Sequence, residues 1–288
     1  MSSQTLPGWI RARKLHLGSL HEVRGVMARG GLHTVCDEAR CPNRSECFAR
    51  GTATFLIMGD VCTRNCRYCS IAHGRPGPLD ANEADEVARA VLDMKLRHVV
   101  ITSVDRDDLV DGGAAHIAAV IAALRALDPR PTVEVLIPDF RGDFAAIDIV
   151  IQSSPDVLNH NIETVRRLYP EVRRQGRYDW ALEVIRRVVA TGPSMITKSG
   201  LMVGLGESFR EVEETLTDLA AAGCRVVTIG QYLRPTSGQV EVARYWSPAE
   251  FVALEEAGRG LGLEVIAGPF VRSSYHAEEA FLRVGGTT

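Results

Sequence analysis

The spacing of the cysteines constrains this chain more than any other feature of its sequence. Of its seven cysteines, six lie in one short stretch. They form a first and a second cysteine group, spaced C-x4-C-x5-C and C-x3-C-x2-C: Cys36, Cys41 and Cys47, then Cys62, Cys66 and Cys69. The apolar segment Thr52–Met58 separates the groups, and we expect it to form a buried strand. The fold must therefore gather each group of thiols on one side of this strand.

Three thiolates in each group favour iron–sulfur clusters over the other uses of cysteine. Thiolate sulfur suits zinc, copper(I) and iron–sulfur clusters. A structural zinc ion needs four protein ligands, which three cysteines do not supply. A [4Fe–4S] cluster is normally held by four thiolates, so a cluster held by three has one iron open to another ligand. Disulfides are disfavoured because no signal peptide is evident and cytosolic thiols stay reduced.

The sequence around both groups resembles known iron–sulfur motifs. The second group, Cys62-Thr-Arg-Asn-Cys66-Arg-Tyr-Cys69, resembles the cluster loop of the radical S-adenosylmethionine (SAM) superfamily. The first group is similar to the auxiliary-cluster motif of the lipoyl synthase family. Five further segments resemble that family in the same order along the chain: Thr102–Asp108, His160–Thr164, Thr197–Glu207, Gly230–Thr236 and Arg272–His276.

Strands alternate with helices along most of the chain, which predicts a parallel sheet. The sequence predicts strands over 52–58, 98–103, 132–137, 157–161, 195–203 and 225–230, with a short strand over 264–267. It predicts helices over 19–29, 82–96, 112–127, 140–149, 178–191, 208–222 and 248–261. Six strand–helix units match the partial (β/α)6 TIM-type barrel that the radical SAM resemblance implies.

Extensions are expected at both ends of this barrel. We expect an N-terminal extension over 1–50 that carries the auxiliary-cluster motif and a radical SAM barrel over 51–235. A C-terminal extension over 236–288 is expected to close on the auxiliary cluster. The apolar segment Pro7–Ile10 and the basic residues after it are expected to strap across the barrel or to serve as a lid for a protein substrate.

Composition and charge limit the classes of partner. The chain is 45% hydrophobic and 24% charged, as in ordinary globular proteins. A formal net charge of −3 provides no global basic field to attract nucleic acid. No apolar run is long enough to span a bilayer. We therefore expect a cytoplasmic protein whose partners are neither nucleic acid nor membrane.

Polar residues at the predicted strand ends are the candidate SAM contacts, because barrels of this type place their chemistry at the carboxyl ends of the strands. These candidates are Ser103, Asp105, Asn161, Glu163, Arg173, Lys198 and Gln231. Lys198 or Arg173 is expected to pair with the SAM carboxylate. Asn161 and Glu163 suit the ribose or methionine part. Gly204 and Gly206 resemble the superfamily's glycine-rich turn near the adenine.

The resemblance implies two [4Fe–4S] clusters and SAM as cofactors. The second cysteine group would bind the cluster that reduces SAM, and the first group would bind the auxiliary cluster. In the family the fourth ligand of the auxiliary cluster is a serine, which matches Ser274 here, with Ser273 as the alternative. Ser274 and the second cysteine group are therefore the expected catalytic residues.

The implied reaction inserts two sulfur atoms, at C6 and C8 of an octanoyl chain on a lipoyl carrier domain. The auxiliary cluster would supply the sulfur, so both cysteine groups must face one cavity. The implied partners are octanoylated lipoyl domains of 2-oxoacid dehydrogenase E2 subunits, the glycine cleavage H protein, and a ferredoxin- or flavodoxin-type electron donor. Two alternatives stay open: another radical SAM enzyme that inserts sulfur or methylthio groups, and a zinc-stabilised binding module.

Other residues with metal-binding side chains have simpler interpretations. Cys224, the seventh cysteine, is expected to be a small buried hydrophobic residue. His33, His160 and His276 are expected to form hydrogen bonds, because the cysteines already account for the clusters. Met202 is expected to form part of a wall.

Overall fold

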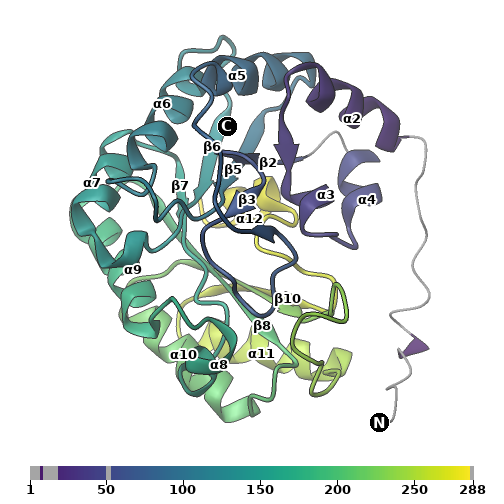
Figure 1. Ribbon diagram of the computed structural model, residues 1–288. Helices are drawn as coiled ribbons and strands as arrows, with labels where there is room; N and C mark the ends of the chain where they lie inside the picture. Colours follow the sequence, from purple (N-terminus) through teal and green to yellow (C-terminus); the bar gives the residue numbers. More distant parts are fainter. Residues whose placement is uncertain (1–6, 9–18, 50–52, 286–288) are drawn as a thin grey trace.

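A single curved sheet forms the centre of the computed structural model, which describes residues 7–8, 19–49 and 53–285 (Figure 1). The sheet has eight strands in the order β1-β2-β5-β6-β7-β8-β9-β10. β1 (His33–Thr34) runs antiparallel to β2, and the remaining neighbours are parallel. The parallel strands are β2 (Thr54–Ile57), β5 (His98–Ser103), β6 (Thr132–Leu136), β7 (Val157–Asn159), β8 (Ile196–Val203), β9 (Val226–Gln231) and β10 (Glu264–Gly268).

Helices cover the outer face of the sheet, as Figure 1 shows. One long helix follows each of the first six parallel strands: α5 (Glu83–Asp93), α6 (Ala114–Arg125), α7 (Phe144–Gln152), α9 (Tyr178–Thr191), α10 (Phe209–Ala221) and α11 (Pro248–Gly260). This arrangement confirms the predicted partial (β/α)6 barrel. Short helical segments occupy some connections: η1 (Phe140–Gly142), η2 (Arg166–Leu168) and α8 (Tyr169–Val172).

Both expected extensions contribute a strand to the main sheet. β10 pairs with β9 in register from Glu264 opposite Val226 to Gly268 opposite Gly230. It therefore adds a seventh parallel strand to the six predicted units. β1 adds an antiparallel strand at the opposite edge. The two edge strands do not pair with each other among the described residues, so the barrel remains open.

The helix before the first cysteine group begins and ends as predicted, at α2 (Ser19–Arg29). Two short helices that periodicity did not reveal follow it: α3 (Val35–Glu38) and α4 (Arg44–Ala49). They are too short for a hydrophobic period to be visible in sequence. α2 packs beside α4 and α5 at one side of the sheet (Figure 1).

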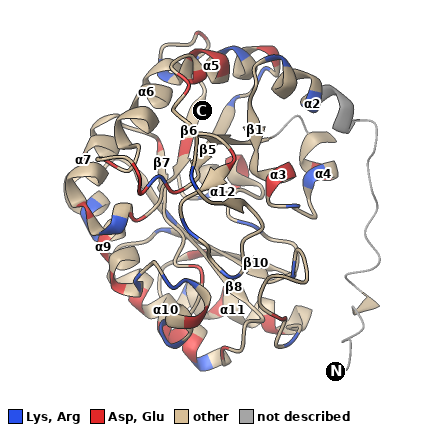
Figure 2. Cartoon of the chain, in the orientation of Figure 1, with Lys and Arg blue, Asp and Glu red and all other residues tan. Residues whose placement is uncertain are grey.

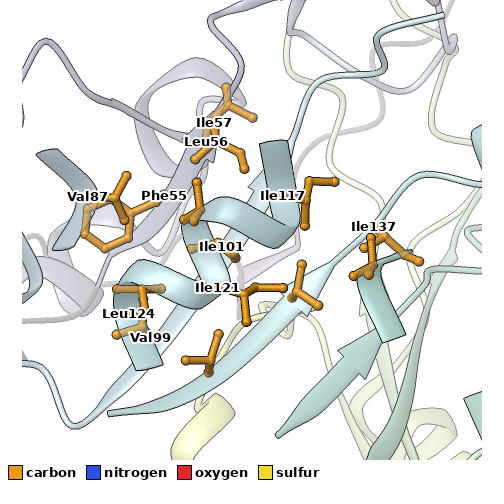
Figure 3. Packing of buried hydrophobic residues seen from close by; sticks show 14 of the residues in the cluster. Phe55, Leu56, Ile57, Val87, Val99, Ile101, Ile117, Ile121, Leu124 and Ile137 are labelled. Atoms are coloured by element: carbon orange, nitrogen blue, oxygen red, sulfur yellow. The ribbon is translucent and has the colours of Figure 1, made fainter. Parts of the chain in front are cut away.

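The main apolar core lies between the first strands and their helices (Figure 3). Phe55 and Ile57 of β2 and Ile101 of β5 are buried in one cluster with Val87 of α5 and with Ile117 and Ile121 of α6. Burial of a side chain of this size contributes about 1.5–3 kcal/mol. The strands read as continuous apolar runs because helices cover one of their faces and the interior of the barrel covers the other.

Two helices begin at a signal that is visible in the sequence. Ser208 and Ser247 each accept a hydrogen bond from the backbone N–H of a glutamate three residues later, and that glutamate side chain bonds back to the serine N–H. This reciprocal pair is a capping box, which satisfies two backbone donors at the start of a helix. It fixes the first turns of α10 and α11.

The last helix closes the amino end of the barrel. α12 (Ala277–Arg283) places Ala280 and Phe281 in a cluster with Val157, Ile196 and Val226. These three valine and isoleucine residues are the first residues of β7, β8 and β9. The segment 269–276, called the tail below, joins the carboxyl end of β10 to α12. It therefore runs through the interior of the barrel, from the carboxyl ends of the strands to their amino ends.

Charged residues lie mainly on the outer helices, and both signs occur along α9 and α10 (Figure 2). Such interspersed charges are typical of a solvated surface. Within the described part of the chain, no helix combines the length and the apolar character that crossing a bilayer requires.

Candidate active site

One chamber of about 500 Å³ brings both cysteine groups together. Cys36 and Cys41 of the first group and all three cysteines of the second group line it, and Ser274 of the tail lies in the same wall. A smaller cavity of about 270 Å³ contains Cys47 and shares Cys36, Cys41 and Ser274 with the chamber. The two groups therefore face a common space, which is the arrangement that sulfur donation requires.

Short local structures position the first cysteine group. Thr34 caps α3 by accepting a hydrogen bond from the backbone N–H of Asp37 at 3.1 Å, which places Cys36 on the first turn. Cys41 follows in a turn whose N–H donates to the Cys36 carbonyl at 3.1 Å. Asn43 donates to the carbonyl of Phe270 at 2.6 Å, which ties this segment to the tail.

A buried arginine holds the loop of the second cysteine group. Arg64 lies between the first two cysteines of that group, and its side chain is 1% exposed. It donates to Asp107 at 2.8 and 2.9 Å and to Asp139 at 2.7 Å. Thr63 adds a hydrogen bond to the carbonyl of Asp105 at 2.9 Å. Sequence reasoning missed Arg64 and Asp139, although an arginine inside a cysteine loop and an aspartate after an apolar strand were visible signals.

Burial keeps the free thiols neutral. Burial, and then the neighbouring Cys41, raises the pKa of Cys36 to about 12. Burial, and then Asp105, raises the pKa of Cys62 to about 12. Backbone N–H groups of Arg64 and Asp105 donate to the Cys62 sulfur at 3.4 and 3.3 Å and favour its thiolate form. Metal binding to these thiols must therefore release protons, and preformed donors stabilise the charge that results.

The thiols of this structure are not arranged around a single zinc ion. Sulfurs around one zinc lie about 3.8 Å apart, because the Zn–S bonds are about 2.3 Å long and tetrahedral. Among the described residues, the only group of three or more candidate ligands with atoms within 4.8 Å of one another is His33, Glu38 and Asp60, which contains no cysteine. No three described thiols are therefore as close together as the ligands of one zinc ion.

Five of the seven candidate SAM contacts line the chamber: Ser103, Asp105, Asn161, Glu163 and Gln231. The hydroxyl of Ser103 is buried and has no hydrogen-bond partner among the described residues. A buried hydroxyl of this kind needs a polar partner from a ligand or water. The chamber therefore offers SAM the type of polar group that its amino acid and ribose parts require.

Lys198, which was expected to pair with the SAM carboxylate, does not line the chamber and is paired inside the protein instead. Its ammonium bonds to both carboxylate oxygens of Glu134, at 2.8 and 3.0 Å, and both side chains are almost completely buried. Lys198 shares the inward face of β8 with Gly200 and Met202, which do line the chamber. It lies deeper than these two, below the floor, because it is farther from the carboxyl end.

Arg173 is also absent from the chamber lining, against expectation. It lies behind the wall, where it donates to the carbonyl of Asn161 at 2.9 Å and pairs with Asp139 at 3.4 Å. Gln231 lines the chamber, but its amide is fully used inside the protein. It donates to the carbonyls of Tyr232 and Arg244 and accepts from the N–H of Trp246. Both residues therefore support the wall rather than offer free groups to SAM.

Glu163 sits in a strained position at the chamber wall. Its φ is +65°, which a residue with a side chain rarely adopts. Backbone hydrogen bonds to Gly200 and from Met202 hold it beside β8. Burial raises the pKa of Glu163, and hydrogen bonds from Asn161 and Tyr68 oppose that rise. Tyr68 is the aromatic residue before Cys69, and its contact with Glu163 gives this position a function that the sequence did not reveal.

The two serines of the tail have different environments. Ser274 lines both cavities beside the first cysteine group, and its hydroxyl accepts a hydrogen bond from Thr54 at 2.8 Å. Ser273 also lines the chamber but not the smaller cavity, and it contacts Asn159 at 2.7 Å and Asn161 at 2.8 Å. Of the two, only Ser274 lies beside Cys47, so the geometry favours it as the cluster ligand.

The tail passes very close to β9. A Cβ atom at Gly230 would lie 2.1 Å from the carbonyl oxygen of Val271. We expect Gly230→Ala to displace the tail and to destabilise the fold by about 1–3 kcal/mol, because overpacking forces the backbone to move. Hydrogen exchange of the tail amides and a denaturant titration would measure both effects. Gly238→Ala is the control, since its Cβ would meet only Thr236, at 3.6 Å; equal effects of both changes would contradict this account.

The remaining sequence predictions have clear outcomes. Cys224 is buried, as predicted, with its sulfur 3.2 Å from the carbonyl of Val226. His160 bonds to the carbonyl of Ile137 at 2.8 Å, and His276 pairs with Glu279 at 2.8 Å, so both form polar contacts as predicted. His33 lies 3.4 Å from Glu38.

Gly204 and Gly206 are not among the residues that line the chamber; both have positive φ in a turn. The expected strap over residues 7–10 extends outside the described residues.

Comparisons with known proteins agree with this site. The sequence matches the Radical SAM superfamily over residues 56–219. It is 51% identical over 280 residues to the lipoyl synthase of Thioalkalivibrio sulfidiphilus (strain HL-EbGR7), and the match covers 96% of this chain and 88% of that protein. The superfamily match implies SAM and a [4Fe–4S] cluster as cofactors.

Solved structures support the fold. Streptococcus suis SuiB bound to S-adenosylmethionine has a TM-score of 0.58 at 12% identity, covering 74% of this chain and 49% of SuiB, so the chain spans about half of that protein. Methylornithine synthase (PylB) has a TM-score of 0.55 at 12% identity, covering 90% of this chain and 83% of PylB. At such identities the likeness concerns the barrel alone. The sequence identity carries the assignment further: this chain belongs to the lipoyl synthase family of radical SAM enzymes.

Proposed function

We propose that this enzyme inserts sulfur at C6 and C8 of an octanoyl chain carried by a lysine of a lipoyl domain. The observation that supports this proposal is the shared chamber, in which both cysteine groups and Ser274 face one space. The acyl chain would enter this chamber, whose lining includes apolar side chains such as Leu56, Leu136 and Met202. Apolar walls favour a fatty chain because its burial removes apolar surface from water.

The second cysteine group would hold the cluster that, with SAM bound, supplies a 5′-deoxyadenosyl radical for hydrogen abstraction. Around it, Ser103 and Asp105 offer polar groups at the end of β5, and Asn161 and Glu163 offer them after β7. These four residues are the SAM contacts that we retain. Arg173 contributes indirectly, because it fixes the backbone of Asn161 from behind the wall. The enclosed walls exclude water from the reacting carbon.

The first cysteine group and Ser274 would hold the second [4Fe–4S] cluster, which we propose as the sulfur source. Serine oxygen binds soft iron–sulfur centres less well than thiolate sulfur does. We propose that Ser274 would hold one iron less firmly than a cysteine would, which suits a cluster that supplies sulfur. A Ser274→Cys variant that keeps full sulfur insertion would contradict this role.

The test of this function is an anaerobic reaction with reconstituted enzyme, SAM, reductant and an octanoyl-lysyl peptide. The expected result is a peptide whose mass increases by two sulfur atoms, because each of two C–H bonds becomes C–S–H under reducing conditions, together with 5′-deoxyadenosine. Formation of 5′-deoxyadenosine without any gain of sulfur would favour a different radical SAM reaction. A colourless protein with zinc as its metal would favour a binding module and overturn the proposal.

The proposed partners follow from the substrate. Octanoylated E2 lipoyl domains and the glycine cleavage H protein carry the lysine-linked chain, and a ferredoxin- or flavodoxin-type protein would supply electrons. We also propose a cytoplasmic location, because the thiols must stay reduced for cluster binding.

A further inference from the structure

A chain of hydrogen bonds rises from below the chamber to residues in its wall, and its first members have no part in the proposed reaction. It begins at Lys198 of β8, whose ammonium bonds to Glu134 of β6. Glu134 also accepts a hydrogen bond from the side-chain amide of Asn159 at 3.1 Å. Glu134, Asn159 and Lys198 are each at most 1% exposed, so water does not compete for these contacts.

The carboxylate of Glu134 fixes the orientation of Asn159. An ionised carboxylate only accepts hydrogen bonds, so the side-chain atom of Asn159 that faces it must be the NH2 group. The NH2 group has two hydrogens, and the second points to the hydroxyl of Ser273 at 2.7 Å. Ser273 therefore acts as an acceptor toward Asn159.

The hydroxyl of Ser273 then fixes Asn161. Because it accepts from Asn159, its single hydrogen is free to donate, and it donates to the side-chain oxygen of Asn161 at 2.8 Å. With its oxygen held by Ser273, Asn161 presents its NH2 group elsewhere, in the wall of the chamber that Glu163 also lines. A Cβ at Gly200 would lie 2.5 Å from that oxygen of Asn161, so glycine is needed there.

The tail serine thus belongs to two parts of the site at once. Ser273 precedes Ser274, which faces the first cysteine group, and it orients Asn161, which lines the chamber with the second group. Its hydroxyl must both accept and donate for the directions of the hydrogen bonds to remain consistent.

We propose that Ser273 is a positioning residue that couples the two cluster sites: its hydroxyl locks the tail so that Ser274 faces the first cysteine group, and it fixes the side-chain orientation of Asn161 in the SAM site. This inference deepens the proposed function and rests on it for the identity of the ligands. It makes SAM binding depend on the orientation of Asn161 that Ser273 sets.

The test compares Ser273→Ala with Ser273→Thr in the cluster-loaded full chain. Alanine is expected to weaken SAM binding about five- to tenfold, the effect of one lost intramolecular hydrogen bond. Hydrogen exchange of the tail amides is expected to become faster, and the spectroscopic signature of an oxygen-ligated iron in the auxiliary cluster is expected to broaden or disappear. Threonine keeps the hydroxyl and is expected to restore all three measurements toward wild type.

Ser247→Ala is the matched control, because it removes a hydroxyl that makes hydrogen bonds at the start of α11, outside both cavities. It is expected to leave SAM affinity and tail exchange unchanged. Wild-type SAM affinity in Ser273→Ala, or a loss of affinity equal to that of Ser247→Ala, would overturn the coupling. These measurements do not involve the octanoyl substrate, so their failure is distinguishable from a failure of sulfur insertion.

Discussion

Replacement of Cys41 by alanine is expected to abolish sulfur insertion while 5′-deoxyadenosine formation continues. Cys41 lines both cavities beside Ser274, whereas the second cysteine group is untouched by this change. Loss of one of three thiolates would release the proposed auxiliary cluster, because a cluster needs nearly its full set of ligands. SAM would still bind and be cleaved at the other cluster. Parallel assays of the lipoylated peptide and of 5′-deoxyadenosine measure the two outcomes.

Cys224→Ala provides the matched control for this experiment. Cys224 is equally a cysteine, but it is buried between α10 and β9, and it lines neither cavity. This variant is expected to retain the iron content of the wild type and to form product. If Cys41→Ala still formed the sulfur-containing peptide, the first cysteine group would not be the sulfur source.

Replacement of Lys198 by methionine is expected to lower stability by about 3–5 kcal/mol, because it leaves the carboxylate of Glu134 buried without its counter-ion. SAM affinity should change much less, since Lys198 lies below the chamber and contacts Glu134 instead. A urea titration and a SAM-binding measurement together separate these effects. A large loss of SAM affinity with unchanged stability would restore the carboxylate-binding role that the sequence predicted for Lys198.

A double variant and the pH dependence sharpen this prediction. Glu134→Gln combined with Lys198→Met removes both charges and is expected to recover much of the lost stability.

Burial opposes the ionisation of Glu134, but Lys198 and His98 lower its pKa to about 2, from an ordinary value of 4.5. The stability from this carboxylate is therefore present above pH 4.5 and is lost as the pH falls toward 2. The difference between wild type and Lys198→Met should narrow over that range.

Local sequence patterns predicted most helices and strands of this protein, but they did not predict how all of these pack together. The apolar runs and helical periods located the six strand–helix units, because these signals depend on neighbours in sequence. The helices around Cys36 and Cys47 were missed because they are too short to show a period. β10 was predicted as a strand, but its place beside β9 depends on pairing between distant segments.

The candidate site shows the same division. Sequence predicted that Ser103, Asp105, Asn161 and Glu163 gather at the strand ends, since carboxyl ends of parallel strands share one edge. Lys198 was misplaced because its depth along β8 and its partner Glu134 depend on the register of strands far apart in the chain. Arg64 was overlooked because its role depends on hydrogen bonds to Asp107 and Asp139, which only the fold brings close to it.

The sequence by itself determined the kind of chemistry, since the number, type and spacing of the cysteines already select a pair of iron–sulfur sites and alternating apolar segments select a parallel barrel. Tertiary structure decided how those sites relate. The tail crosses the interior of the open barrel, so Ser273 and Ser274 meet residues more than a hundred positions earlier in the chain. Contacts at that separation arise from the packing of the whole sheet, which no local pattern of residues encodes.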